Sequence, residues 1–181
     1  RLYFMPRKEI KRRTEELLEF CDLIKFRKRT VRKLSGGMKR KLMVCRALLT
    51  DPEILLLDEP TAGMDALSRR QMWNLLRKLN GKNLTILLTT HYMEEAQNLC
   101  SRVALMDHGK LEEVNTPAGL IDSLGNYTVD EFAGDETHSH YFHSREEAIA
   151  YLSDLSGQAS LRETTLEDVF VERAGRHLMP S

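Results

Sequence analysis

Apolar residues recur at helical spacing along much of the chain. Amphipathic helices are predicted at residues 7–24, 35–50, 67–80, 92–100 and 145–155. Pro6 suits the first position of the first helix, and Ser35 is a good N-cap for the second. Gly81 suits the position just after the third helix. The front of the chain is therefore predicted to be mainly helical.

Two short apolar runs break this pattern and predict strands. Ile54–Leu57 and Leu84–Leu88 lack polar alternation, which is typical of strands buried on both faces of a parallel sheet. Asp58 and Glu59 follow the first run, and His91 follows the second. Ligands bind at the carboxyl ends of strands in open α/β sheets, so these polar side chains predict a site there. The plainer interpretation is a strand that ends in an acidic turn.

The remainder of the chain predicts smaller elements. Residues 103–114 form a hairpin pattern around Gly109, which can take a positive φ, and a short helix follows from Thr116 to about residue 124. Residues 125–181 predict a small α+β extension. Its histidines, His138, His140 and His143, are weak zinc candidates, because no acid or cysteine lies at matching spacing and strand alternation separates His143.

Composition narrows the class of protein. The chain has 181 residues, no apolar run long enough to span a bilayer and no visible signal peptide. Cys21, Cys45 and Cys100 are scattered on apolar helical patterns and are predicted to be buried reduced thiols. Because the chain begins at Arg1, close to a helix, we expect it to be a piece of a longer protein.

The charges are unevenly spread. Residues 1–50 contain 16 Lys and Arg against 5 Asp and Glu, a net +11, and the remainder carries a net −11. A basic front half fits an anionic membrane surface, an acidic partner or nucleic acid. A solvated helical face explains it equally well.

The turn Ser35-Gly36-Gly37 has its own chemistry. Glycines at a helix start let backbone N–H groups approach an anion, which the helix dipole favours. By itself such a turn is more often an ordinary capped helix start. The turn becomes evidence for an anion-binding site only in combination with the acids Asp58 and Glu59 later in the chain.

Together these motifs resemble the ATP-binding cassette (ABC) family. Leu34–Met38 resembles the signature motif, Ile54–Pro60 the Walker B strand with its catalytic glutamate, Ala62–Asp65 the D-loop, and Thr89–His91 the H-loop. Lys41 departs from the arginine usual in the family, so a bidentate contact there would be weakened. Met38 in place of the usual glutamine, and the stretch Leu166–Phe170, resemble drug- and lipid-exporter-like (ABC-2 type) members.

The resemblance implies an α/β fold: the second half of a P-loop NTPase-like parallel sheet core, with a helical subdomain and an α+β extension. It places the helical subdomain at residues 1–50, the core half with its hairpin at 51–124 and the extension at 125–181. The phosphate-binding sequence Gly-x-x-x-x-Gly-Lys-[Ser/Thr] does not occur in this chain, and the family's glutamine loop would also precede Arg1. The isolated chain is therefore expected to hydrolyse ATP negligibly.

The resemblance also implies cofactors, residue roles and partners. ATP and Mg2+ are the implied cofactors: Asp58 would hold Mg2+, while Glu59 and His91 would be catalytic. Residues bound to ATP in trans, across a head-to-tail dimer of cassettes, would be Ser35, Gly36, Gly37 and Met38, with Asp65 at the dimer seam. The other implied partner is a transmembrane permease, at the cytoplasmic face of the membrane, with no nucleic acid expected.

Two other functions stay open at this point. One is a soluble cassette ATPase that acts on nucleic acid or ribosomes, although no coiled-coil insert or tandem cassette is present. The other is a non-catalytic interaction module, against which the intact Asp58, Glu59 and His91 argue. The sequence does not name a transported substrate.

Overall fold

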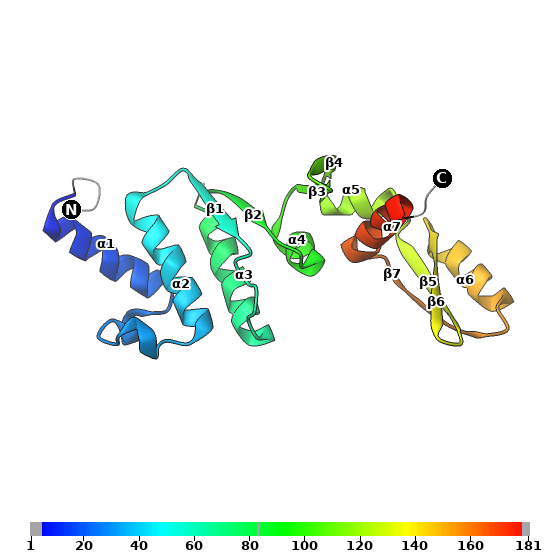
Figure 1. Cartoon of the computed structure of the whole chain (residues 1–181), viewed down its shortest axis with the longest axis horizontal. Helices are drawn as coiled ribbons and strands as arrows, with labels where there is room; N and C mark the ends of the chain where they lie inside the picture. The colour runs from blue at the N-terminus through cyan, green and yellow to red at the C-terminus, as the bar shows by residue number, and fades with distance from the viewer. Residues whose placement is uncertain (1–4, 83, 179–181) are drawn as a thin grey trace. The chain divides into compact units, whose positions relative to one another are not determined.

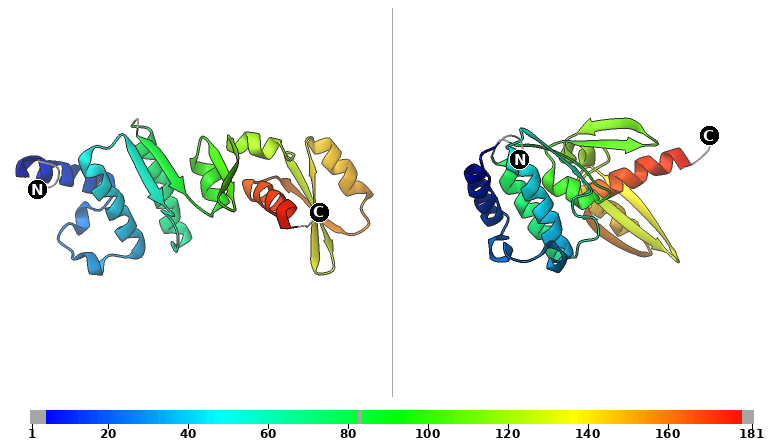
Figure 2. Two further views of the ribbon diagram at one scale, coloured as in Figure 1. Left: turned by 45° about the horizontal axis from the view of Figure 1, so that its top comes forward. Right: turned by 60° about the vertical axis from the view of Figure 1, so that its left-hand side comes forward.

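The computed structural model describes residues 5–82 and 84–178. It divides into two compact units, Arg1–His91 (unit 1) and Tyr92–Ser181 (unit 2) (Figures 1 and 2). The finer division at residues 50 and 124 stays a prediction. Within the described ranges, no helix combines the length and the apolar character needed to cross a membrane.

Unit 1 begins with a pair of helices joined by a connector. The elements are α1 (Arg7–Phe20), the 3-10 turns η1 (Ile24–Phe26) and η2 (Val31–Lys33), α2 (Gly36–Ala47) and the 3-10 turn η3 (Leu48–Thr50). α1 ends before its predicted limit because Asp22 takes a left-handed φ of 59°, which a helix cannot continue through. Pro6 lies at the extended position before α1 rather than at its first turn. Ser35 caps α2 as predicted: its Oγ accepts a hydrogen bond from the Met38 N–H at 3.2 Å.

A parallel pair of strands with a connecting helix completes unit 1. β1 (Ile54–Asp58) and β2 (Thr85–Thr89) pair in parallel, from Ile54 opposite Thr85 to Asp58 opposite Thr89. Between them runs α3 (Ala66–Asn80), whose buried stripe is Met72, Trp73, Leu75, Leu76 and Leu79. The predicted α/β architecture with a parallel sheet is therefore confirmed.

Burial of these strands on both faces, however, is wrong for this chain. Leu55 is buried, but Leu56 is 69% exposed and Leu87 is 63% exposed. Successive side chains of a strand point to opposite faces of the sheet, so cover on one side leaves the other set exposed. Within the described residues, one face of this two-stranded sheet stays uncovered.

The cysteines also depart from prediction. The structure joins Cys21 and Cys45 as a disulfide, with Cα atoms 6.8 Å apart, whereas Cys100 is free. The expectation of reduced thiols is therefore wrong for the pair, which only the packing of α1 against α2 brings together. For Cys100, burial raises the pKa of the thiol, and the nearby charge of Glu95 raises it further.

Unit 2 is built around an apolar cluster contributed by several of its elements. These are α4 (Met93–Leu99), β3 (Val103–Asp107), α5 (Pro117–Asp122) and α7 (Leu166–Leu178), while β4 (Lys110–Asn115) pairs with β3 to form the hairpin. The buried members of the cluster are Ala96, Val103, Leu105, Leu120, Leu166 and Val169. The predicted hairpin turn is present: Gly109 has a φ of 76°.

A three-stranded antiparallel sheet forms the rest of unit 2. Its strands are β5 (Tyr127–Ala133), β6 (Glu136–Phe142) and β7 (Gln158–Glu163), in the order β6-β5-β7, with α6 (Arg145–Asp154) between β6 and β7 in sequence. Strand pairing places Glu131 opposite His138, and the Glu131 Oε2 atom is 3.6 Å from His140 Nε2. The sequence spacing did not reveal this acid. In the part of the chain that the structure describes, no group of three His, Cys, Asp or Glu side chains is arranged to hold a metal.

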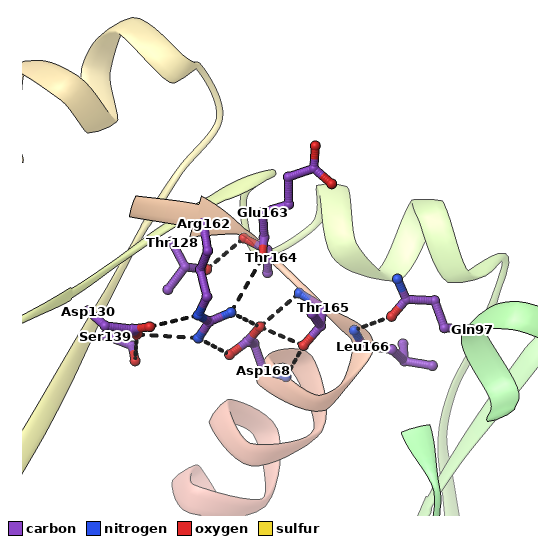
Figure 3. A network of polar contacts seen from close by, with 10 residues as sticks. All are labelled: Gln97, Thr128, Asp130, Ser139, Arg162, Glu163, Thr164, Thr165, Leu166 and Asp168. Atoms are coloured by element: carbon purple, nitrogen blue, oxygen red, sulfur yellow. Dashed lines mark hydrogen bonds and ion pairs between the residues drawn. The ribbon is translucent and has the colours of Figure 1, made fainter. Parts of the chain in front are cut away.

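Arg162 ties the sheet to the start of α7 (Figure 3). Its Nε and Nη2 atoms donate to Asp130 at 2.6 and 3.3 Å, and its Nη1 and Nη2 atoms donate to Asp168 at 2.8 Å each. Asp168 also accepts hydrogen bonds from the N–H and hydroxyl of Thr165, both at 2.7 Å, which caps α7. The side chains of Asp130 and Asp168 are only 11% and 13% exposed. Burial alone raises their pKa values, but the hydrogen bonds that each accepts outweigh it, so both pKa values lie below the ordinary range.

Two valines on α7 provide a matched test of the core of unit 2. Val169 is 1% exposed and Val171 is 60% exposed. Val169→Ala is expected to lower the free energy of unfolding by about 2 kcal/mol, because it removes two packed methyl groups. Val171→Ala should change it by less than about 0.5 kcal/mol, because the exposed site loses no packing. Urea denaturation followed by circular dichroism checks both, and equal effects would contradict the packing.

The Arg162 network predicts a specific dependence on pH. A carboxylate with a lowered pKa stabilises the fold above its ordinary pKa and loses that contribution on acidification, so wild-type stability should fall below about pH 4. Arg162→Met removes the hydrogen bonds and the positive charge that Arg162 supplies, so the pKa values of Asp130 and Asp168 should rise. Arg162→Met should therefore lower the free energy of unfolding by about 2 kcal/mol at pH 7. The loss should be smaller near pH 4, where both acids can be neutral. Urea titrations at both pH values measure this, with the exposed Arg102→Met as control, and a penalty independent of pH would refute it.

Candidate active site

The carboxyl ends of β1 and β2 bring the predicted polar residues together. Asp58 and Thr89 are partners in the strand register. The Thr89 hydroxyl donates to Asp58 Oδ1 at 2.5 Å and accepts from the Glu59 N–H at 3.3 Å, and the Thr89 carbonyl accepts from the same N–H at 3.1 Å. Thr89 therefore fixes both acids. Sequence reasoning gave it no separate role, although its place opposite Asp58 at the end of β2 was the available signal.

Glu59 adopts an uncommon backbone conformation that turns the chain out of β1. Its φ is 46°, in the left-handed region that a side chain with a Cβ seldom adopts and that is enriched at functional sites. The Glu59 Oε2 atom lies 2.8 Å from His91 Nδ1, a contact that is an ion pair when the imidazole is protonated. Oε2 is buried and accepts no aligned hydrogen bond from the described residues. Buried acceptors are nearly always satisfied, and here the His91 imidazole is the group that faces this oxygen.

This arrangement has a definite chemical capacity. Glu59 offers a carboxylate oxygen that can orient a water and take its proton, with His91 in contact. Asp58 is exposed at the strand end, and a carboxylate oxygen is a hard ligand of the kind that Mg2+ prefers. Asp58, Glu59 and His91 thus form one set at one edge of the sheet.

The second predicted set lies at the start of α2. The first N–H groups of a helix have no partner within it, so those of Gly36 and Gly37 can meet an anion. Open space surrounds Gly36: a Cβ added there would meet no atom within 4 Å. Gly37 lies against α3, where an added Cβ would be 3.1 Å from Ser68 Cβ and Oγ.

Asp65 is connected to this turn through Ser68. Asp65 caps α3, since its carboxylate accepts from the Ser68 N–H at 2.9 Å and from the Ser68 hydroxyl at 2.7 Å. The hydrogen bond from the Ser68 hydroxyl lowers the pKa of Asp65. Lys41 makes a second link to α3 with a single hydrogen bond to Gln71 Oε1 at 3.2 Å. The sequence did not single out Ser68 or Gln71.

These contacts place the start of α2 and the start of α3 around a shared groove. Its volume is about 560 Å3, and the residues that line it include Ser35, Gly37, Met38, Lys41, Ser68 and Gln71. Both helix starts lie at the lower end of unit 1 in Figure 1. The predicted anion-binding turn and the predicted seam residue therefore share a neighbour, Ser68.

Comparison with known families agrees with these motifs. Residues 4–62 match the family model described as ABC transporter. The Nod factor export ATP-binding protein I of Cupriavidus pinatubonensis is 39% identical over 191 residues, which is 93% of this chain and 58% of that protein. The protein of the same name from Rhizobium meliloti strain 1021 is 39% identical over 199 residues, 98% of this chain and 59% of that protein. The chain thus spans about three fifths of the length of these relatives.

Solved structures resemble the chain in fold. CbiO1 from Clostridium perfringens, described as part of the ABC transporter complex cbiONQ, aligns with a TM-score of 0.62 and 26% identity. The alignment covers 66% of this chain and 48% of that protein. The fold is therefore shared with a protein of known structure that is described as part of an ABC transporter complex.

The two glycines of the α2 turn give a matched test of its packing. Gly36→Ala should raise the free energy of unfolding by at most about 1 kcal/mol, because a helical glycine is replaced where space is open. Gly37→Ala should be less stable than Gly36→Ala, because Asp65 holds the Ser68 side chain that the new methyl group would meet. Urea unfolding of both variants measures the difference. Adding Ser68→Gly should reduce the penalty at position 37 and not alter the effect at position 36; equal behaviour of both alanines would contradict the contact.

Proposed function

The chain belongs to the ABC transporter family, and we propose that it is part of an ATP-binding subunit whose ATP hydrolysis drives a membrane exporter. The observation that carries the proposal is the close contact of Glu59 Oε2 with His91 Nδ1, beside Asp58 at the strand ends. A carboxylate held against an imidazole, next to a second acid, suits the activation of a water for attack on a phosphate.

In this mechanism each residue of the strand-end set has one task. Glu59 orients the attacking water and accepts its proton, and its carboxylate is in contact with His91. His91 holds the Glu59 carboxylate and meets the γ-phosphate. Asp58, oriented by the Thr89 hydroxyl, would hold Mg2+. Bound there, Mg2+ would neutralise charge on the transferred phosphate.

The start of α2 serves a different nucleotide. We assign Ser35, Gly36, Gly37 and Met38 to the ATP held by a second cassette, in a head-to-tail dimer with Asp65 at the seam. The free N–H groups of a glycine turn at a helix start suit a phosphate. Ser68, which touches Gly37 and is bonded to Asp65, then connects the seam to the turn.

The partner and cargo follow from the relatives only in part. We propose a transmembrane permease as partner, with the chain at the cytoplasmic face of the membrane. The curated relatives are named for Nod factor export. We extend export to this chain, and the Nod factor cargo stays a property of those relatives.

The uncovered face of the β1–β2 sheet fits this proposal. Ile54, Leu56 and Leu87 would pack against the remaining part of the ATPase core, which would also supply the phosphate-binding loop. An apolar set of this kind is costly to leave in water. The 181-residue chain alone is accordingly expected to hydrolyse ATP negligibly.

The role of Glu59 is tested in the full-length protein. Glu59→Gln should lower ATP turnover by at least about a hundredfold while ATP binding persists, because an amide cannot accept the proton from water. Steady-state phosphate release and nucleotide binding measure the two effects. Glu53→Gln, which changes an exposed acid just before β1, should leave turnover unchanged. Turnover near the wild-type value in Glu59→Gln would remove Glu59 from catalysis.

A further inference from the structure

The connector between α1 and α2 is densely basic. Six of the nine residues in 25–33 (the basic connector) are Lys or Arg: Lys25, Arg27, Lys28, Arg29, Arg32 and Lys33. All six are exposed. None of the site chemistry described above uses them.

Very little in unit 1 neutralises this charge. Arg27 pairs with Glu15 at 3.4 Å, and the Arg29 guanidinium lies 5.0 Å from the centre of the Phe26 ring. Among the residues that the structure describes, the other four cations have no ion pair. The adjoining turn contributes one acidic residue, Asp22, which is exposed. The basic connector therefore presents a nearly uncompensated positive surface.

The position of the basic connector makes it accessible. It forms the turn at one end of the α1–α2 pair, at the lower left of Figure 1, and it leads directly into Leu34 and Ser35. Val31, in the middle of the cations, is 56% exposed. An apolar side chain surrounded by cations suits the boundary between headgroups and acyl chains.

We propose that the basic connector binds an anionic phospholipid surface. Clustered Lys and Arg side chains attract anionic leaflets without fixed geometry, and each cation near the surface strengthens binding about fivefold. Nucleic acid fits less well, because base stacking needs an open aromatic face and Arg29 lies over the ring of Phe26. The biological setting rests on the proposed function, which puts the chain beside a membrane, but the charge and exposure do not depend on ATP hydrolysis.

Vesicle co-sedimentation of the full-length protein tests this proposal. The probes are vesicles of phosphatidylcholine alone and vesicles in which roughly a third is phosphatidylglycerol. Binding is expected only to the anionic vesicles and should weaken with added salt. The variant Lys25→Gln, Lys28→Gln, Arg32→Gln should bind on the order of a hundredfold more weakly. The control Arg102→Gln, Lys110→Gln, Arg145→Gln removes three exposed cations from unit 2 and should bind as wild type.

The outcomes separate this proposal from the catalytic one. If the connector variant loses vesicle binding and keeps ATP turnover, the basic connector binds the lipid surface. This conclusion does not depend on the turnover measured for Glu59→Gln. Three results overturn it: no preference for anionic vesicles, equal loss in both triple variants, or tighter binding to a single-stranded RNA oligonucleotide than to the vesicles. Circular dichroism of each triple variant establishes that it is folded before binding is compared.

Discussion

The parallel pairing of β1 with β2 is the constraint on which the strand-end site depends. The register that places Thr89 opposite Asp58 lets one hydroxyl hold the Asp58 carboxylate and the Glu59 N–H together. The left-handed turn at Glu59 is thereby anchored, and its carboxylate reaches His91. A slip of one residue would send each side chain to the opposite face and separate this set. The backbone pairing of β1 with β2 therefore brings the polar side chains of this site together.

Polar side chains also hold separate elements together in two other parts of the chain. Ser68 is held by Asp65 and lies where a Cβ added to Gly37 would be 3.1 Å away, so the lack of a side chain at Gly37 lets the turn of α2 pack closely against α3. In unit 2, Arg162 holds Asp130 and Asp168 and so fixes the start of α7 on the sheet. In each case a pair of elements distant in sequence is joined by a polar group whose loss would leave a partner unsatisfied.

What the sequence predicted was mostly local. The cap at Ser35, the turn at Gly109 and the strands at 54–57 and 84–88 follow from short-range spacing. All are present, and the two strands span Ile54–Asp58 and Thr85–Thr89. Features set by tertiary packing were missed: the Cys21–Cys45 disulfide, the acid opposite His138, and the roles of Thr89 and Ser68. The burial expected of β1 and β2 failed for a related reason. An apolar run shows that a strand is suited to burial on both faces, but among the residues that the structure describes, one face of this sheet is left uncovered.

We propose that the turn of α2 and the strand-end acids act on one nucleotide from different copies of the protein. The most direct test mixes two full-length variants, Ser35→Arg and Glu59→Gln, each expected to lack turnover by itself. In a head-to-tail dimer, the mixed pair keeps one site with an intact turn from one copy and intact acids from the other. Recovery of ATP turnover on mixing is the predicted result. A mixture as inactive as its parts would contradict this division of the site between two copies.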